Sequence, residues 1–226
     1  MDNNIGPKIK IIDDTSKKEV KKNDILKIHI GEQAPDIKII KGSSQKATPY
    51  GGQIDELVKP DHPLLKTKLE EYDFKNPLLM SSEELQRRLI LALAHYKGYG
   101  LSANQIGLPY RCFVAGNDDL GMEAFFNPKI TQVSTDVTAL EEGCLTYPCL
   151  YLRIKRPNRV AIEWKNVHGD YRKGNFVGLT ARILQHEMDH LNGILFTSYA
   201  TPFELRRARE QQEKILKKLH REKQRK

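Results

Sequence analysis

Residues 179–191 read LTARILQHEMDHL, the most informative segment of the chain. Its apolar residues recur at the 3.6-residue spacing of a helix, which predicts a helix over residues 180–191. His186 and His190 stand four residues apart, so a helix places both imidazoles on one face, within reach of one metal ion. Glu187 lies beside them and can accept a proton from a water molecule at that metal. The stretch therefore predicts a buried helix that carries a hydrolytic metal site.

Two histidines alone do not complete such a site, and the H-E-x-x-H pattern also arises by chance in core helices. Downstream, the only histidine is His220, which lies in a basic tail. Upstream, residues 142–148 read EGCLTYP. Cys144 offers a thiolate, a good ligand for first-row metals, and the glycine before it lets the backbone approach closely. Taken alone, a cysteine is more often a small buried hydrophobe, the role we assign to Cys112, whereas Cys149 either lines the site or is open to oxidation.

The rest of the chain predicts an α+β fold, with mostly antiparallel sheets around the metal-binding helix and a further helix at the C-terminus. A helix is expected from Ser81 or Ser82 to about Lys97, ending at Gly98, because a capping box precedes apolar residues at helical spacing. Residues 98–107 are rich in glycine and indicate a helix cap followed by a turn. Strands are expected at residues 25–30, 37–40, 111–115, 124–126, 150–154 and 160–164.

The net charge of +8 lies mainly at the C-terminal end. Residues 1–56 hold 10 basic and 9 acidic side chains, residues 57–200 hold 17 and 16, and residues 201–226 hold 10 and 4. Thr201 and Glu204 form a capping box, so the last segment is expected to be a basic helix. Such a helix is either merely solvated or binds a polyanion in a salt-dependent way. We expect three parts: an N-terminal extension of unknown role, a catalytic domain and this basic helix.

The composition excludes several classes of protein. The chain is 39% hydrophobic and 29% charged, and its longest apolar run, residues 89–94, is far shorter than the roughly 18 residues of a membrane span. Its first residues follow neither a signal-peptide nor a transit-peptide pattern. Three cysteines, an odd number, argue against a disulfide framework and favour a reducing compartment. The expected location is the cytoplasm, without a membrane partner.

Three stretches of sequence, taken together, indicate a protein family far more specifically than any one of them alone. They read G-x-G-L-x-A-x-Q-I-G at 98–107, E-G-C-L-x-x-P at 142–148 and Q-H-E-x-D-H-L-x-G at 185–193. In this order they resemble the peptide deformylase family over about residues 57–200. The resemblance implies the deformylase fold and an enzyme that removes the formyl group from the N-terminal formyl-methionine of nascent chains. It also implies one divalent metal ion, natively Fe²⁺, with Zn²⁺, Ni²⁺ or Co²⁺ as substitutes.

The resemblance also assigns roles to single residues. The implied metal ligands are Cys144, His186 and His190. Glu187 would act as the general base and then as the acid toward the leaving amine, while Gln105 and the backbone N–H of Leu145 would hold the developing oxyanion. The positions that match substrate-binding residues are Tyr99, Gly100, Gly143, Leu179 and Ile183. The two glycines would leave room for the peptide backbone, and the other three would line the methionine pocket.

The chain departs from the family's usual residues at Ser102, Asn104, Thr146 and Cys149. None of these is a ligand or the base, so the departures leave the predicted chemistry in place. Near the site, Asp189 faces away from the metal, and we expect it to pair with Arg156.

Two other functions fit parts of the pattern. A general metallopeptidase would cleave internally blocked peptides without a preference for formyl-methionine. A ribosome- or RNA-binding protein with a degenerate deformylase domain would use mainly its basic tail, but the intact ligand set and Glu187 count against it. Residues 201–226 resemble the ribosome-binding C-terminal helix of some members of the family, which implies contact with ribosomal RNA.

Overall fold

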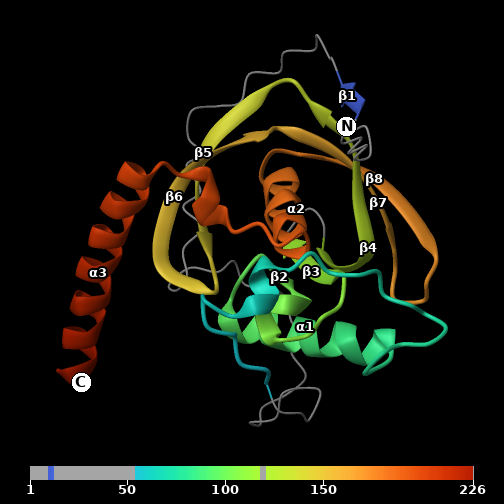
Figure 1. Ribbon diagram of the computed structural model, residues 1–226, viewed down its shortest axis with the longest axis horizontal. Helices are drawn as coiled ribbons and strands as arrows, with labels where there is room; N and C mark the ends of the chain where they lie inside the picture. Colours follow the sequence, from blue (N-terminus) through green and yellow to red (C-terminus); the bar gives the residue numbers. More distant parts are fainter. Residues whose placement is uncertain (1–9, 13–53, 118–120, 226) are drawn as a thin grey trace, which may run out of the picture.

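The structure, a computed structural model, describes residues 10–12, 54–117 and 121–225. Two antiparallel sheets surround a central helix (Figure 1). The strands of the larger sheet, in spatial order, are β2 Gly100–Ser102, β3 Cys112–Asn117, β4 Gly121–Ser134, β7 Arg159–Lys165 and β8 Tyr171–Val177. The short β1, Lys10–Ile12, adds to β4 in parallel. The second sheet pairs β5, Val137–Cys144, with β6, Tyr147–Pro157. The predicted α+β class with mostly antiparallel sheets is confirmed.

The α-helices of the described residues are α1 Ser82–Tyr96, α2 Gly178–Leu191 and α3 Pro202–Gln224. Short 3-10 helices lie at η1 Pro63–Lys66, η2 Ala103–Ile106 and η3 Phe196–Tyr199. α1 begins as predicted, because the Ser81 hydroxyl accepts a hydrogen bond from the Glu84 N–H. It ends at Lys97, whose φ of 55° closes the helix one residue before the predicted Gly98.

Some strands differ from those expected. Residues 98–107 are more than a cap and turn, since they contain β2 and η2. β4 is far longer than the predicted residues 124–126. The prediction was too short because register shifts after Phe126 interrupt the apolar pattern of this strand. β5 and β8 were not predicted, since their exposed polar residues hide the alternation that marks a half-buried strand. The strands expected at 25–30 and 37–40 lie outside the described residues.

α2 lies at the middle of the molecule and contacts both sheets (Figure 1). Ala181, Leu184 and Met188 on its apolar face pack against Phe125 and Ile162 of the larger sheet. Most of its other residues are buried as well, which is typical of a helix enclosed by a core rather than lying on a surface. The predicted buried helix is therefore confirmed, and the β5–β6 pair lies close to its metal-ligand face.

α3 runs along the outside of β6 and leaves the body toward its C-terminal end (Figure 1). Thr201 and Glu204 form the predicted capping box at its start. Leu205 and Ala208 pack, partly buried, against a small core cluster that includes Cys144 and Phe196. Within the described residues, no helix is both long and apolar enough to cross a membrane.

Candidate metal centre

α2 and the end of β5 bring the three predicted ligands together. His186 and His190 lie one turn apart on α2, and Cys144 is the last residue of β5, where the register shifts so that it pairs with Tyr147. One ligand atom of each residue lies within 4.8 Å of the other two. The Sγ atom of Cys144 is 3.3 Å from Nε2 of His190, and both side chains are buried.

This donor set suits a divalent first-row metal ion. In a tetrahedral site with bonds of about 2.1 Å to nitrogen and about 2.3 Å to sulfur, neighbouring ligand atoms stand about 3.5 Å apart. The 3.3 Å between the sulfur of Cys144 and the His190 nitrogen agrees with that spacing. Three protein ligands also leave one coordination position open, as a hydrolytic site requires. Cys144, His186 and His190 can therefore hold one ion with room for a reactant.

Glu142 orients the ring of His186, a role that the sequence analysis did not assign. Its Oε2 lies 3.2 Å from Nδ1 of His186, so the other ring nitrogen is the one available to a metal. Arg156 holds both carboxylate oxygens, at 2.6 and 2.9 Å, and Arg182 reaches Oε1 at 2.5 Å. Glu142 lies two residues before Cys144 in the chain, so a search for charged residues next to the predicted ligand could have pointed to it.

The charge of Glu142 is secured by these partners. Burial alone would favour its neutral form, but the hydrogen bonds from His186 and Arg156 lower the pKa of Glu142 to about 2. Arg156 also pairs with Asp189 at 2.8 Å, so the predicted contact between these two residues is present. The network therefore joins β5, β6 and α2 directly behind the ligands.

Glu187 is buried beside the ligands, and its carboxylate is only partly satisfied. In the described part of the chain, no hydrogen-bond partner reaches its Oε2 atom. Burial raises the pKa of Glu187 to about 7, although the positive charges of His186 and Arg156 act in the opposite direction. A carboxylate with a pKa near neutrality can both accept and donate a proton at physiological pH. Glu187 is therefore the residue of this site best suited to proton transfer.

Gly100 leaves the space that Glu187 occupies. A Cβ atom at position 100 would stand 2.5 Å from Oε1 of Glu187. The side chain of Glu187 can therefore keep this position only if residue 100 has no side chain. The family resemblance implies that this glycine makes room for substrate backbone, and the structure adds a reason inside the protein itself.

A narrow cavity opens beside the ligands. The predicted site residues that line it are Tyr99, Gly100, Gln105, Gly143, Cys144, Leu145, Ile183, His186 and Glu187. Nε2 of Gln105 lies 3.5 Å from Sγ of Cys144, at the inner end of this cavity. Leu179 is not among the lining residues, and it packs, like Tyr99, against the apolar cluster between α2 and the larger sheet. Its place in the methionine pocket stays a prediction.

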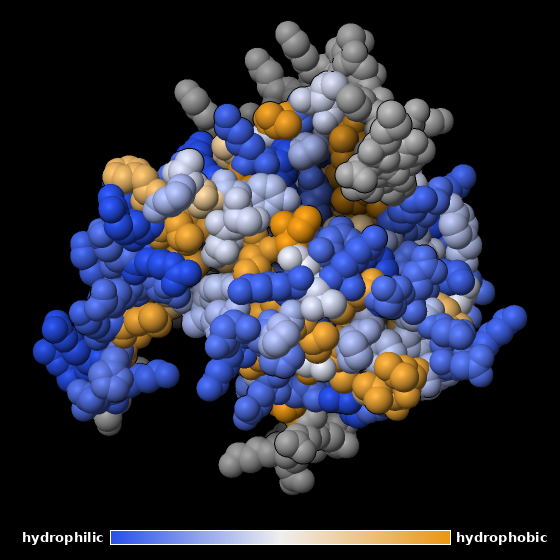
Figure 2. Space-filling model, in the orientation of Figure 1, coloured by the Kyte–Doolittle hydropathy of each residue, from blue (hydrophilic) through white to orange (hydrophobic). Residues whose placement is uncertain are grey.

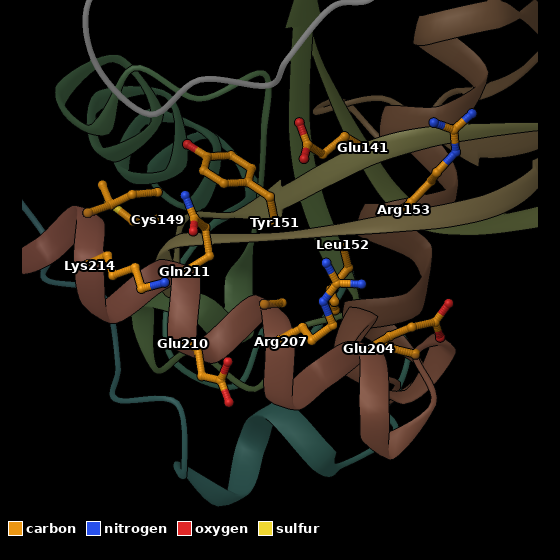
Figure 3. A pocket seen from close by; sticks show the side chains of 13 residues that line it. Glu141, Cys149, Tyr151, Leu152, Arg153, Glu204, Arg207, Glu210, Gln211 and Lys214 are labelled. Atoms are coloured by element: carbon orange, nitrogen blue, oxygen red, sulfur yellow. The ribbon is translucent and has the colours of Figure 1, made fainter.

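A second hollow, of about 820 Å³, lies between the outer face of the β5–β6 pair and α3 (Figure 3). Its charged lining mixes acidic residues such as Glu141 with basic residues such as Arg153 and Lys214. Cys149 lies here, on the outer face of β6, and does not line the metal-site cavity. Of the two alternatives for this cysteine, the one that placed it in the site is therefore wrong.

Comparisons with known proteins agree with this geometry. The family model described as Polypeptide deformylase matches residues 54–206. A peptide deformylase of Thermotoga maritima is 37% identical over 131 residues, which cover 56% of this chain and 78% of that protein. One of Acinetobacter baumannii is 41% identical over 128 residues, covering 56% and 73%. The crystal structure of a peptide deformylase from Legionella pneumophila has a TM-score of 0.66 and 26% identity, covering 75% of this chain and 99% of that one.

Proposed function

The chain belongs to the peptide deformylase family, and from that premise we propose that it releases formate from formyl-methionyl nascent peptides at the Cys144, His186 and His190 centre. The observation that carries this proposal is the position of Glu187. A buried carboxylate with a pKa of about 7 and one unpartnered oxygen stands beside three metal ligands, in the wall of a cavity. That arrangement suits the hydrolysis of a small amide, in which one group must move a proton twice.

Each residue has a chemical task in this reaction. A divalent ion at the centre would polarise the formyl carbonyl and make a water molecule nucleophilic at neutral pH. Glu187 takes one proton of that water and delivers it to the amine nitrogen as the carbon–nitrogen bond breaks, so that water and the N-formyl amide become formic acid and a free amine. The formic acid then loses its proton to solvent and leaves as formate. Nε2 of Gln105 and the backbone N–H of Leu145 donate hydrogen bonds to the carbonyl oxygen as it becomes negative.

The substrate follows from the shape and lining of the cavity. Tyr99 and Ile183 supply an apolar wall for the methionine side chain, and Leu179 packs against the neighbouring apolar cluster. Gly143 lines the cavity on β5, where the lack of a side chain would let the peptide backbone lie close, whereas the space beside Gly100 is taken by Glu187. The narrow cavity favours the small formyl group over larger acyl groups, which separates this proposal from a general metallopeptidase.

The proposed native metal is Fe²⁺, with Zn²⁺, Ni²⁺ or Co²⁺ as substitutes. One thiolate and two imidazoles are acceptable ligands for all four ions. Metal analysis of protein purified without oxygen is expected to find about one iron per chain. Purified protein that is active but contains none of these ions would contradict the proposal.

Formate release from formyl-Met-Ala-Ser tests the reaction. The wild-type protein with Fe²⁺ should release formate, and Glu187→Gln should lose at least about 1,000-fold in kcat while keeping its metal. Glu210→Gln, an exposed change of the same kind on α3, should match the wild type. Wild-type protein that cleaves acetyl-Met-Ala-Ser as fast as the formyl peptide, or that releases no formate, would contradict the proposed deformylase activity.

We further propose that α3 contacts ribosomal RNA and that the enzyme works in a reducing compartment, the cytoplasm. Gln212 on α3 donates a hydrogen bond to the carbonyl oxygen of Pro148 at 2.7 Å. Beyond it the helix is almost entirely exposed, and the side chains of Lys217 and Lys218 are 66% and 79% accessible. Figure 2 shows this projecting end as a mostly hydrophilic surface that stands away from the body. Such a basic rod can approach a phosphate backbone without covering the cavity.

A salt titration of ribosome co-sedimentation tests this contact. The variant replaces Lys217, Lys218, Arg221 and Arg225 with glutamine, and its control replaces Lys66, Lys68, Lys129 and Lys173 on the body. The α3 variant should bind at least about tenfold more weakly at low salt, with a shallower salt dependence and unchanged formate release. If the control loses as much affinity, net charge rather than α3 is responsible and the proposal fails.

A further inference from the structure

Gln105 is held in one orientation by the backbone around it. Its Oε1 accepts a hydrogen bond from the N–H of Ser102 at 3.0 Å, and a backbone N–H can only donate. The amide nitrogen must therefore be at the other end of the group, where it lies 3.1 Å from Oγ1 of Thr146 and 3.5 Å from Sγ of Cys144. Gln105 is 1% exposed, so water does not compete for these positions.

Thr146 takes one of the two hydrogens on that nitrogen. Its hydroxyl oxygen accepts from Nε2, which leaves the second hydrogen directed toward Cys144 and the cavity. Thr146 is itself 3% exposed and lies in the turn between β5 and β6, just after Cys144 and Leu145. The side chain of Thr146 thus fixes the Gln105 amide to the turn that carries the Leu145 N–H and directly follows the ligand Cys144.

Ser102 fixes the oxygen end of the same amide. Its hydroxyl lies 3.0 Å from Oε1 of Gln105 and 2.8 Å from Oδ1 of Asn104, so its single hydrogen is shared between two acceptors. Nδ2 of Asn104 in turn donates to the backbone oxygen of His190 at 2.7 Å and to that of Leu64 at 3.1 Å. The chain of contacts therefore runs from the end of α2 through η2 to the amide of Gln105.

We propose that Thr146 and Ser102 are positioning residues that hold the Gln105 amide so that its second N–H, which contacts Sγ of Cys144, faces the cavity and the substrate oxygen. The inference rests on the proposed deformylase reaction and explains two residues that none of the catalytic roles uses. Thr146 is the more important of the two, because its hydroxyl sits on the nitrogen side and decides which hydrogen faces the cavity. Ser102 adds to a hydrogen bond that its own backbone N–H already makes.

Steady-state kinetics of formate release from formyl-Met-Ala-Ser provide the first test. Thr146→Val keeps the shape of the side chain but removes the acceptor, and it should lower kcat about tenfold with KM within about twofold. Thr146→Ser keeps the hydroxyl and should restore most of kcat. Ser102→Ala should lower kcat about threefold. Thr131→Val, which removes a hydroxyl bonded to Ala161 at a remote point of β4, should have no effect.

A double-mutant cycle separates positioning from a merely structural role. In a Gln105→Leu background there is no amide to orient, so adding Thr146→Val should change kcat by less than about twofold. An equal loss in both backgrounds would overturn the proposal, because Thr146 would then act independently of Gln105. The wild type must release formate in the same assay, and if it does not, the proposed function fails rather than the inference about Thr146.

The absorption spectrum of the Co²⁺ form gives a readout that does not depend on turnover. The N–H of Gln105 that faces Cys144 withdraws charge from the sulfur, so its loss should shift the sulfur-to-cobalt charge-transfer band to lower energy. Thr146→Val and Gln105→Leu should shift the band in the same direction, and Thr146→Ser should leave it in place. A Thr146→Val protein that is folded and binds cobalt but has the wild-type band would refute the proposed orientation.

Discussion

At the level of single residues, neighbouring groups in the site hold one another in one position and one orientation. Glu187 occupies the space that a side chain at Gly100 would need, and Glu142 holds His186 by one ring nitrogen so that the other is available. Each contact joins residues that are distant in the chain and buried together. A substitution at Gly100 should therefore affect mainly the catalytic rate, and a substitution at Glu142 should affect mainly the stability of the fold.

Gly100→Ala should displace the carboxylate of Glu187 while leaving the ligands in place. The added Cβ would overlap Oε1, and one of the two chains must move, so we expect kcat to fall at least about tenfold. Bound metal, measured by elemental analysis, should stay near one ion per chain. Gly174→Ala on β8, where the added Cβ would meet the rings of Phe176 and Trp164, serves as the control with unchanged kcat. Full activity in Gly100→Ala would show that Glu187 needs no such space.

Glu142→Gln should destabilise the protein strongly. The change leaves the buried guanidinium group of Arg182 without a negative partner and leaves Arg156 with Asp189 alone, and a broken buried pair typically costs about 3–5 kcal/mol. The free energy of unfolding in urea measures this loss. Asp136→Asn removes an ion pair with Arg159 in which the carboxylate is 50% exposed, and it should cost at most about 0.5 kcal/mol. Equal effects of the two changes would contradict the account of the buried network.

At the scale of the elements, the helices depend on signals at their ends, and the strands depend on their neighbours. α1 and α3 each begin at a hydroxyl that accepts a backbone N–H three residues on, so their starts follow from a few adjacent residues. β5 and β8 are polar and partly exposed, and they become strands because β6 and β7 pair with them. The pairing also sets where β5 ends, and hence where Cys144 lies.

Thr201→Ala should loosen the start of α3 without changing turnover. The hydroxyl accepts from the Glu204 N–H, and such caps contribute about 1 kcal/mol. Hydrogen exchange of the backbone amides at residues 204–212 should become faster, whereas the amides of α2 should be unaffected. Thr201→Ser keeps the cap and should exchange as the wild type does. Unchanged exchange in Thr201→Ala would mean that packing of Leu205 and Ala208 alone sets the stability of this helix.

At the scale of the whole molecule, the metal centre lies where the two sheets meet the central helix. Cys144 comes from the β5–β6 pair, while α2 packs against the larger sheet and supplies both histidines. A bound ion therefore adds a link between the end of β5 and α2. The basic end of α3 lies outside this arrangement, so the net charge of the chain has little bearing on the chemistry.

Removal of the metal should accordingly lower the Tm. An ion that binds only the folded state contributes about 4 kcal/mol when its free concentration is 1,000 times its Kd, and a chelator removes that contribution. Thermal unfolding with and without chelator measures the difference. His190→Ala lacks a ligand and should show little response to the chelator. A wild-type Tm that stays the same after elemental analysis shows loss of the ion would contradict a metal that joins β5 to α2.

The helices and the metal ligands were predictable from the chain alone. Helix caps, apolar spacing and the four-residue step between His186 and His190 are local features, so neighbouring residues suffice to predict them. The residues that support the metal site became visible only in the folded molecule. Glu142 against His186, and Thr146 against Gln105, are pairs far apart in the chain whose contacts exist because β5, η2 and α2 pack together. Local spacing carries no information on such distances, because they are set by how whole elements bury one another's faces.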